Sequence, residues 1–429
     1  MSERYKASEA FLARALRTIP LGSQTFSKSK IQLPFGVSPY FVDRGRGSHF
    51  WDVDGNEYLD FVNALACVTL GYCDPDVDAA VRRQMESGVT FSLPHRLEAE
   101  VAEILVEMIP CADKVRFAKN GSDATAGAIR VARAFTGRDR VAVCGYHGWQ
   151  DWYIGSTTRD LGVPSAVKEL THTFSYNDPL SLQKVLEDHS GEFAAVILEP
   201  MNVAYPADGF LEKVQALARL HGALLVFDET VTGFRYAHGG AQQEFGVTPD
   251  LATFGKGMAN GYPLSALVGK AEYMDVVESI FFSGTFGGET LSLAAAKAAL
   301  TKLRKEPVLE TIRKQGQKIV DGTAQLIEAL GLHDIVTVEG HPAWSFLVFK
   351  SVAQYSVSET KTLFLQEMFR RGIYTLGTHN MSYAHSDGDI QCLMAAYREV
   401  LGLIGAAVRE GRVLERLECQ PLIPLFKVR

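Results

Sequence analysis

A lysine and an aspartate stand out because each lies where a buried strand is expected to end. Lys256 belongs to the segment Thr-Phe-Gly-Lys-Gly at residues 253–257, and Asp228 ends the apolar run 223–227, 28 residues before the lysine. An amine between glycines can approach a flat ligand closely, and a carboxylate at the end of a buried strand can hold a protonated ring nitrogen. Taken alone, Lys256 also fits a solvated surface lysine, and Asp228 a helix cap or a structural ion pair.

A turn of small residues precedes a predicted helix and offers a site for a phosphate group. Residues 115–118 predict a short strand, Gly121 and Ser122 follow in the turn, and apolar residues recur at helical spacing from Ala124 until Gly137. Backbone N–H groups at the start of a helix bind phosphate, and the Ser122 hydroxyl can add a hydrogen bond. A plain serine cap is the alternative. The amine, the ring-nitrogen partner and the phosphate turn together predict a site for pyridoxal phosphate (PLP).

An aromatic and a basic side chain follow the next predicted strand. Tyr146 and His147 come soon after the apolar run at residues 141–143, between Gly145 and Gly148. An aromatic ring at the end of a strand can stack on a planar cofactor, so Tyr146 is the candidate for that role. His147 fits equally a structural, hydrogen-bonded histidine and a residue that positions the cofactor or the substrate.

These residues need a scaffold of alternating strands and helices. From about Gly71 to Leu303, buried strands such as 194–198 and 223–227 alternate with helices, which is typical of a doubly wound parallel sheet. We therefore expect a large cofactor-binding domain at 71–305, and a small domain in which residues 306–429 pack with the N-terminal segment 1–70. Outside the large domain the sequence predicts a helix at about 3–17, strands near 40–42, 50–52 and 344–349, and helices at 358–371 and 389–409.

The composition is typical of a soluble enzyme. The 429 residues are 47% hydrophobic and carry a net charge of -7, so the chain can form more than one core and has no basic footprint for nucleic acid. No uncharged apolar run of about 18 residues occurs, and no signal-peptide core is found, so we expect a cytoplasmic protein that does not bind membranes. The six cysteines are scattered, which fits free thiols and no metal site.

In this order, the motifs resemble those of the class III aminotransferases among the fold-type-I PLP enzymes, especially the glutamate-1-semialdehyde 2,1-aminomutase branch. The resemblance covers nearly the whole chain. The matching segments are residues 51–60 (WDVDGNEYLD), 120–124 (NGSDA), 146–148 (YHG), 198–200 (LEP), 228–235 (DETVTGFR), 255–256 (GK) and 283–286 (SGTF). The family implies an α/β fold, with a mostly parallel seven-stranded sheet flanked by helices and a smaller α+β domain.

The resemblance implies which residues hold PLP. Lys256 would form the Schiff base and shuttle a proton, and Asp228 would pair with the pyridine nitrogen. Gly121 and Ser122 would hold the phosphate together with Thr285, which the neighbouring subunit of a homodimer would donate.

The same resemblance implies what surrounds the ring. Tyr146 would stack on one face, and Thr230, where the family usually has valine, would pack on the other. His147 would lie beside the cofactor. Glu199 matches an acidic residue near the floor of the site, where a salt-bridge role and a substrate-gating role are both open.

The resemblance specifies the cofactor better than the substrate. The aminomutase branch has an arginine-bearing element that grips the substrate carboxylate, whereas the corresponding residues 22–30 contain only Lys28 and Lys30 as cations. A lysine lacks the planar two-pronged donor of arginine. We therefore expect an aminotransferase that uses an amino-acid donor such as glutamate and an aldehyde or ketone acceptor such as a sugar or other polar metabolite.

Three other activities are compatible with the same scaffold. The first is a glutamate-1-semialdehyde 2,1-aminomutase, and the second is a PLP-dependent racemase or decarboxylase. The third is an inactive protein that retains PLP as a scaffold. An intact Lys256 and Asp228 argue against the third, because loss of the lysine would be its simplest sign in a sequence.

Overall fold

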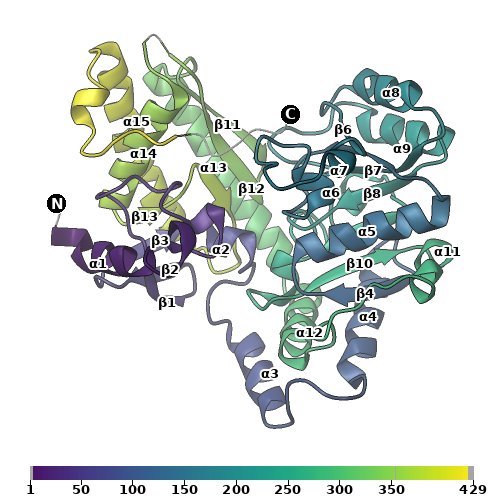
Figure 1. Ribbon diagram of the computed structural model, residues 1–429. Helices are drawn as coiled ribbons and strands as arrows, with labels where there is room; N and C mark the ends of the chain where they lie inside the picture. The colour runs from purple at the N-terminus through teal and green to yellow at the C-terminus, as the bar shows by residue number, and fades with distance from the viewer. Residues whose placement is uncertain (1–2, 353, 424–429) are drawn as a thin grey trace. The chain divides into compact units, whose positions relative to one another are not determined.

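The computed structural model describes residues 3–352 and 354–423. The chain divides into two compact units, which we name by their place in the sequence (Figure 1). Among the described residues, the central unit is Pro75–Leu309, and the terminal unit combines residues 3–74 with residues 310–352 and 354–423.

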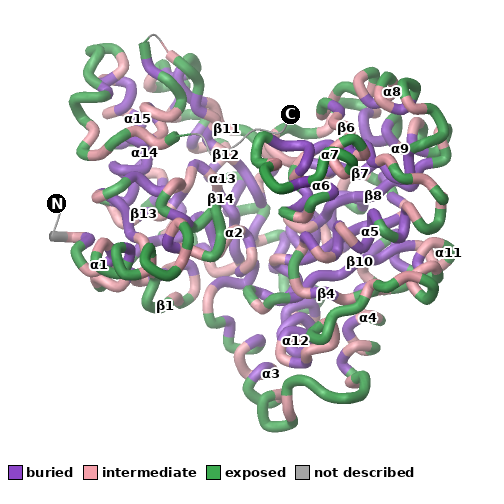
Figure 2. The backbone as a smooth tube through the Cα atoms, in the orientation of Figure 1, coloured by how far each residue is buried: buried purple, intermediate pink, exposed green. Residues whose placement is uncertain are grey.

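A seven-stranded sheet forms the middle of the central unit. Its order is β4 (Lys114–Ala118), β10 (Ser265–Gly269), β9 (Leu251–Phe254), β8 (Leu224–Asp228), β7 (Phe193–Leu198), β5 (Arg140–Cys144) and β6 (Thr171–Thr173). The five strands from β9 to β6 are parallel, whereas β10 is antiparallel to both of its neighbours. Every residue of β7, β8, β9 and β10 is buried (Figure 2). The predicted α/β fold with a mostly parallel seven-stranded sheet is confirmed.

Helices connect these strands. The central unit contains α3 (Pro75–Met85), α4 (Arg96–Met108), α5 (Gly121–Thr136), α6 (Asp151–Ile154), α7 (Ser165–Lys168), α8 (Pro179–Asp188), α9 (Phe210–Leu220), α10 (Ala241–Phe245), α11 (Ala271–Met274) and α12 (Thr290–Lys305), with the 3-10 turns η4 (Lys256–Ala259) and η5 (Asp275–Glu278).

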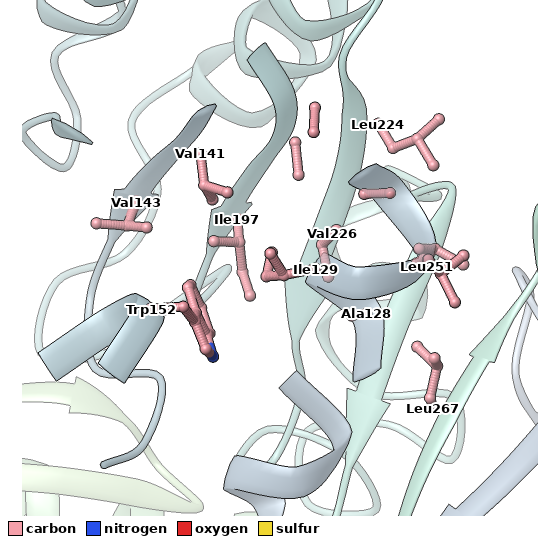
Figure 3. Packing of buried hydrophobic residues seen from close by; sticks show 14 of the residues in the cluster. Ala128, Ile129, Val141, Val143, Trp152, Ile197, Leu224, Val226, Leu251 and Leu267 are labelled. Atoms are coloured by element: carbon pink, nitrogen blue, oxygen red, sulfur yellow. The ribbon is translucent and has the colours of Figure 1, made fainter. Parts of the chain in front are cut away.

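Helix α5 packs against the sheet, and both of its ends are well defined. The carboxylate of Asp123 accepts the Asn120 N–H at 2.8 Å ahead of the first turn, and Gly137 ends the helix in the left-handed region at φ 68°, as predicted. The helix packs on β7, β9 and β10. Ala128 and Ile129 on its inner face share a buried cluster with strand residues such as Val226, so the sheet fixes where the first turn of α5 lies (Figure 3).

Two smaller sheets build the terminal unit. One has the order β1 (Val42–Arg46), β2 (His49–Asp52), β3 (Glu57–Asp60) and β13 (Ile373–Tyr374), and the other β11 (Val336–His341), β12 (Trp344–Phe349) and β14 (Thr378–Asn380). The helices are α1 (Lys6–Ala15), α2 (Asn63–Ala66), α13 (Val308–Leu330), which begins two residues before the unit boundary, α14 (Val357–Arg370) and α15 (Asp387–Arg409), with η1 (Glu3–Tyr5), η2 (Pro20–Gly22), η3 (Phe26–Lys28) and η6 (Leu414–Arg416).

Two predicted elements near the N-terminus have different ends in the structure. The helix expected at 3–17 is a regular α-helix only from Lys6 to Ala15. Beyond Ala15 the chain forms turns, and Pro20 disfavours helical backbone at the residue before it, so the helix does not continue. The strand expected at 40–42 begins at Val42, where pairing with Asp52 starts.

A left-handed turn, α2, follows β3. Four consecutive residues have positive φ: Asn63 at 47°, Ala64 at 51°, Leu65 at 60° and Ala66 at 68°. None is glycine, so each pays a steric cost of about 1–2 kcal/mol. The carboxylate of Asp60 accepts the N–H groups of Val62 at 2.7 Å and Asn63 at 3.0 Å, which holds the entry to the turn.

Helix α15 is the one helix, within the described part of the chain, that is long and apolar enough to cross a membrane. Half of that stretch is buried inside the protein. Its buried side chains include Leu393, Tyr397 and Val400, and the helix packs against α14, so its apolar face is used within the terminal unit.

Candidate active site

Polar side chains collect where four parallel strands of the central sheet end. Asp228 is the last residue of β8, Glu199 follows β7, and Tyr146 and His147 follow β5. Lys256 comes two residues after β9, whose Thr253 is paired in register with Asp228. Because the carboxyl ends of parallel strands meet at one edge of a sheet, the fold brings these predicted residues to a common edge, where α/β proteins bind ligands.

Asp228 is a buried carboxylate with four hydrogen-bond donors. Oδ1 accepts from the Thr230 hydroxyl at 2.5 Å, the Thr230 N–H at 3.1 Å and the Thr253 hydroxyl at 3.2 Å. Oδ2 faces Nδ1 of His147 at 2.9 Å. Burial acts to raise the pKa of Asp228, but the hydrogen bond and charge of His147 and the bonds from Thr230 outweigh it and hold this pKa below its usual value. Asp228 is therefore a charged acceptor inside the protein.

His147 is also buried, and both of its ring nitrogens face oxygen acceptors. Nδ1 faces the Asp228 carboxylate, and Nε2 faces the carbonyl oxygen of Cys144 at 3.1 Å. These contacts make His147 a partner of the carboxylate rather than an isolated core histidine.

Glu199 is a second carboxylate at the same edge, in a different electrostatic state. It accepts the Tyr146 N–H and the Asn202 amide, each at 3.0 Å. Burial and, after it, the negative charge of Asp228 raise the pKa of Glu199. One carboxylate is thus kept charged while its neighbour gains affinity for a proton, an arrangement that is common where acid–base chemistry takes place.

The side chain of Tyr146 is half exposed at this edge of the sheet. It is 49% exposed, while on its buried side it meets Tyr153 edge to face, with ring centroids 5.6 Å apart. Burial, followed by the charges of Asp228 and Glu199, raises the pKa of Tyr146, so the phenol stays neutral. A neutral aromatic ring held at its edge can stack on a flat ligand.

The first turn of α5 forms a close-fitting cradle. A Cβ added at Gly121 would lie 3.0 Å from Cγ2 of Thr230, and one added at Gly148 would lie 2.5 Å from Oγ of Ser122. Oγ of Ser122 also accepts the Trp149 N–H at 3.3 Å, which leaves its own proton to donate. Helix N–H groups, a free hydroxyl proton and the absence of side-chain bulk suit a phosphate group.

Lys256 opens the 3-10 turn η4 with a strained backbone. Its φ is 43°, in the left-handed region, which costs a residue with a side chain of order 1–3 kcal/mol and is often found at functional sites. Gly255, just before it, lies against Thr230, because a Cβ there would be 3.4 Å from Cγ2 of that residue. The backbone just before Lys256 therefore lies next to Thr230, which donates to Asp228.

Thr285 is placed differently from the other predicted residues. It lies exposed in the loop before α12, and it lines a cavity of about 410 Å³ together with Lys119, Asp123 and Gln150. That cavity does not include Gly121 or Ser122.

Two residues of this edge were missed by the sequence analysis. Thr253 precedes Phe-Gly-Lys in β9 and donates to Asp228, and Asn202 donates to Glu199. A threonine within an otherwise apolar buried strand was an available signal for the first. Asn202 lies three residues after its partner Glu199 in an irregular loop, where no helical or strand periodicity marks a residue as part of the site.

Comparison with known proteins identifies the family of this chain. A family model for class III aminotransferases matches residues 34–383. The 3-aminobutyryl-CoA aminotransferase of Cloacimonas acidaminovorans (strain Evry) is 36% identical, over 94% of this chain and 98% of that protein. A glutamate-1-semialdehyde 2,1-aminomutase of Desulforapulum autotrophicum is 34% identical, over 92% and 99%.

Solved structures show the same fold. The PLP internal aldimine form of the FumI protein from Sphingopyxis sp. MTA144 superposes with a TM-score of 0.88 at 30% identity, over 97% of this chain and 99% of the other. An omega-transaminase from Sphaerobacter thermophilus gives a TM-score of 0.84 at 27% identity, over 94% and 100%. The chain therefore belongs to the class III aminotransferases, and it is a PLP-dependent transaminase or aminomutase.

Proposed function

We propose that the strand ends and the first turn of α5 hold PLP through a small set of side chains. Lys256 carries the cofactor and moves the proton, Asp228 holds the protonated ring nitrogen, and Gly121 and Ser122 bind the phosphate at the start of α5. The observation that supports this set best is the buried carboxylate of Asp228, because four hydrogen-bonding groups surround it and its pKa is held below its usual value.

The ring faces are covered by two further residues in this proposal. Tyr146 stacks on one face, and Thr230 packs on the other. Glu199 fixes the backbone of Tyr146 by accepting its N–H, and its raised pKa suits a group that can hold a proton next to the substrate. When bound, PLP supplies a ring that accepts negative charge from the carbon beside the amino nitrogen.

We propose amino transfer between two small molecules rather than isomerisation of one. The donor is an amino acid, with glutamate as the first candidate, and the acceptor is an aldehyde or ketone such as a sugar or other polar metabolite. The supporting observation concerns the 22–30 segment of the terminal unit, which lines a cavity of about 490 Å³; among the described residues that line it, Lys28 is the one cation. These described lining residues include no guanidinium that could hold a carboxylate in two-pronged fashion.

The same cavity bears on the acceptor. Its walls include the hydroxyl group of Ser23 and the amide of Gln24 among apolar side chains such as Leu33 and Phe41. The hydroxyl groups of Tyr40 and Tyr72 also line it, but they already donate to the carbonyl oxygen of Pro34 and to Asp60. A substrate with a few hydroxyl groups and no required carboxylate suits such walls better than a five-carbon amino acid aldehyde. Ser29 does not add to this polar lining, because it is buried and its hydroxyl donates to the carbonyl oxygen of Phe26.

An aminomutase is the second candidate, because several relatives about one-third identical are glutamate-1-semialdehyde 2,1-aminomutases. Against it stands the 3-aminobutyryl-CoA aminotransferase, a relative with similar coverage and slightly higher identity.

Assembly and location complete the proposal. We propose a homodimer in which Thr285 reaches the phosphate of the partner's site. Its exposed loop also carries Phe281 and Phe286, which are 80% and 58% exposed, and exposed aromatic side chains of this kind favour an interface. The protein would act in the cytoplasm, without nucleic acid or a membrane as a partner.

The two activities can be separated with the purified holoenzyme. Amino donors are offered one at a time while the absorption of the cofactor reports whether it has taken up an amino group, and aldehydes and ketones are then offered to the aminated enzyme. The proposal predicts that glutamate aminates the cofactor and that an acceptor removes the group, with the Lys256→Ala variant as the control. Efficient formation of 5-aminolevulinate from glutamate 1-semialdehyde without any donor would instead establish the aminomutase.

A further inference from the structure

Thr230 lies two residues after Asp228 and donates hydrogen bonds to its carboxylate. Its hydroxyl and its N–H both donate to Oδ1, and the hydroxyl of Thr253 donates to the same oxygen. A carboxylate oxygen offers about two lone pairs, so Oδ1 is saturated. Oδ2 has one partner among the described residues, His147, and it keeps the remaining capacity to accept.

The side chain of Thr230 is fixed in the orientation that makes this bond. Its Cγ2 methyl group lies next to two glycines, since a Cβ at Gly121 would be 3.0 Å away and one at Gly255 would be 3.4 Å away, and its hydroxyl lies 3.2 Å from the same position at Gly121. Threonine is stiff about χ1 because its Cβ is branched. With the methyl group held between the phosphate turn and the segment leading to Lys256, the hydroxyl stays on Asp228.

We propose that Thr230 is a positioning residue that keeps Oδ1 of Asp228 occupied, so that Oδ2 accepts the proton of the cofactor's ring nitrogen, and that its hydroxyl moderates how strongly the carboxylate holds that proton. The proposal rests on the PLP site proposed above. Its physical basis is that each donor on a carboxylate stabilises the negative charge and so weakens its attraction for a further proton.

Other charged or titratable groups act on the same carboxylate. His147 pairs with Oδ2, Glu199 repels it from the end of β7, and the phenols of Tyr146 and Tyr153 lie within its electrostatic reach. These groups are unchanged when Thr230 is replaced by valine, which keeps the shape and removes the hydroxyl. The substitution therefore isolates one hydrogen bond.

The test compares Thr230→Val with Thr230→Ser, and uses Thr253→Val as the matched control. Thr253 donates to the same oxygen at 3.2 Å instead of 2.5 Å, so its loss should matter less. In the apoprotein, the carboxyl of Asp228 is titrated by carbon NMR with labelled aspartate, and Asp228→Asn assigns the signal. In the holoenzyme, protonation of the ring nitrogen is followed by nitrogen NMR with PLP labelled at that atom.

We expect Thr230→Val to raise the pH at which Asp228 takes up a proton and the pH at which the ring nitrogen loses one. Thr230→Ser should restore both values, and Thr253→Val should shift them less. No shift in Thr230→Val, a downward shift for the ring nitrogen, or an equal shift in Thr253→Val would overturn the proposal. If Thr230→Val loses PLP, the apoprotein titration decides alone. Neither measurement needs a substrate, so a failure of the proposed amino transfer leaves this result readable.

Discussion

Substitution of Gly148 by alanine should disturb the site through backbone strain and through a clash with Ser122. Gly148 has φ 106°, where an L-residue is strained, and a Cβ there would lie 2.5 Å from Oγ, 2.7 Å from Cβ and 3.0 Å from Cα of Ser122. Serine is short and sits in the first turn of α5, so a long flexible side chain is not available to move aside. We expect the backbone strain to cost about 1–3 kcal/mol. Overpacking adds about 1–3 kcal/mol more.

A control in the same unit separates the two costs. Gly162 has a similar φ of 92°, but nothing lies within 4 Å of the Cβ that alanine would add. Gly162→Ala should therefore show the strain alone, and the difference between the variants should be the clash, about 1–3 kcal/mol. The free energy of unfolding of the apoproteins is measured by urea denaturation.

The same pair of variants tests the phosphate cradle. Because the clash displaces Ser122, Gly148→Ala should raise the dissociation constant for PLP by about tenfold, which corresponds to about 1.4 kcal/mol. Gly162→Ala should leave PLP binding unchanged. Equal losses of stability in the two variants, or unchanged PLP binding in Gly148→Ala, would refute the reasoning from this contact.

Three further predictions concern other parts of the molecule. Borohydride should attach PLP to Lys256, and Lys256→Ala should lose at least about 10²–10⁴-fold in turnover while still binding PLP; peptide mapping of the adduct to another lysine contradicts this. Thr285→Ala should weaken PLP retention by about 1.5–3 kcal/mol in a homodimer, whereas full activity of a diluted monomer argues against a shared site. Burial lowers the pKa of His379 to about 3 and of His385 to about 4. Since the unfolded chain protonates histidine near pH 6.5, the free energy of unfolding should fall as the pH drops from about 6.5 to 4, and His385→Gln should flatten this slope in urea titrations.

The sequence alone predicted the scaffold of the site well, because the relevant signals are local. The apolar run before Asp228 became the buried strand β8, and helical spacing between Gly121 and Gly137 became α5 with the predicted end. These features depend on neighbouring residues in the chain, so periodicity and turn chemistry are enough to find them.

The hydrogen bonds within the site could not be predicted, because they join residues that are far apart in the sequence. His147 and Asp228 are 81 residues apart, and only the fold shows that one donates to the other. Thr230 was expected to pack on a face of the ring, and only the structure shows that its hydroxyl donates to Asp228. The strained φ of Lys256 is likewise invisible in a sequence, because lysine has no preference for that region.

The left-handed turn α2 offers a starting point for protein engineering. The substitution Ala64→Gly would remove about 1–2 kcal/mol of steric cost from the folded protein. Against this, the greater flexibility of glycine would favour the unfolded chain by about 0.4–1 kcal/mol. Ala64 is only partly buried, so the lost methyl group matters little. The balance favours a small gain in thermostability from a residue usually avoided in stabilised variants. Laboratory evolution for heat resistance is therefore expected to select Ala64→Gly.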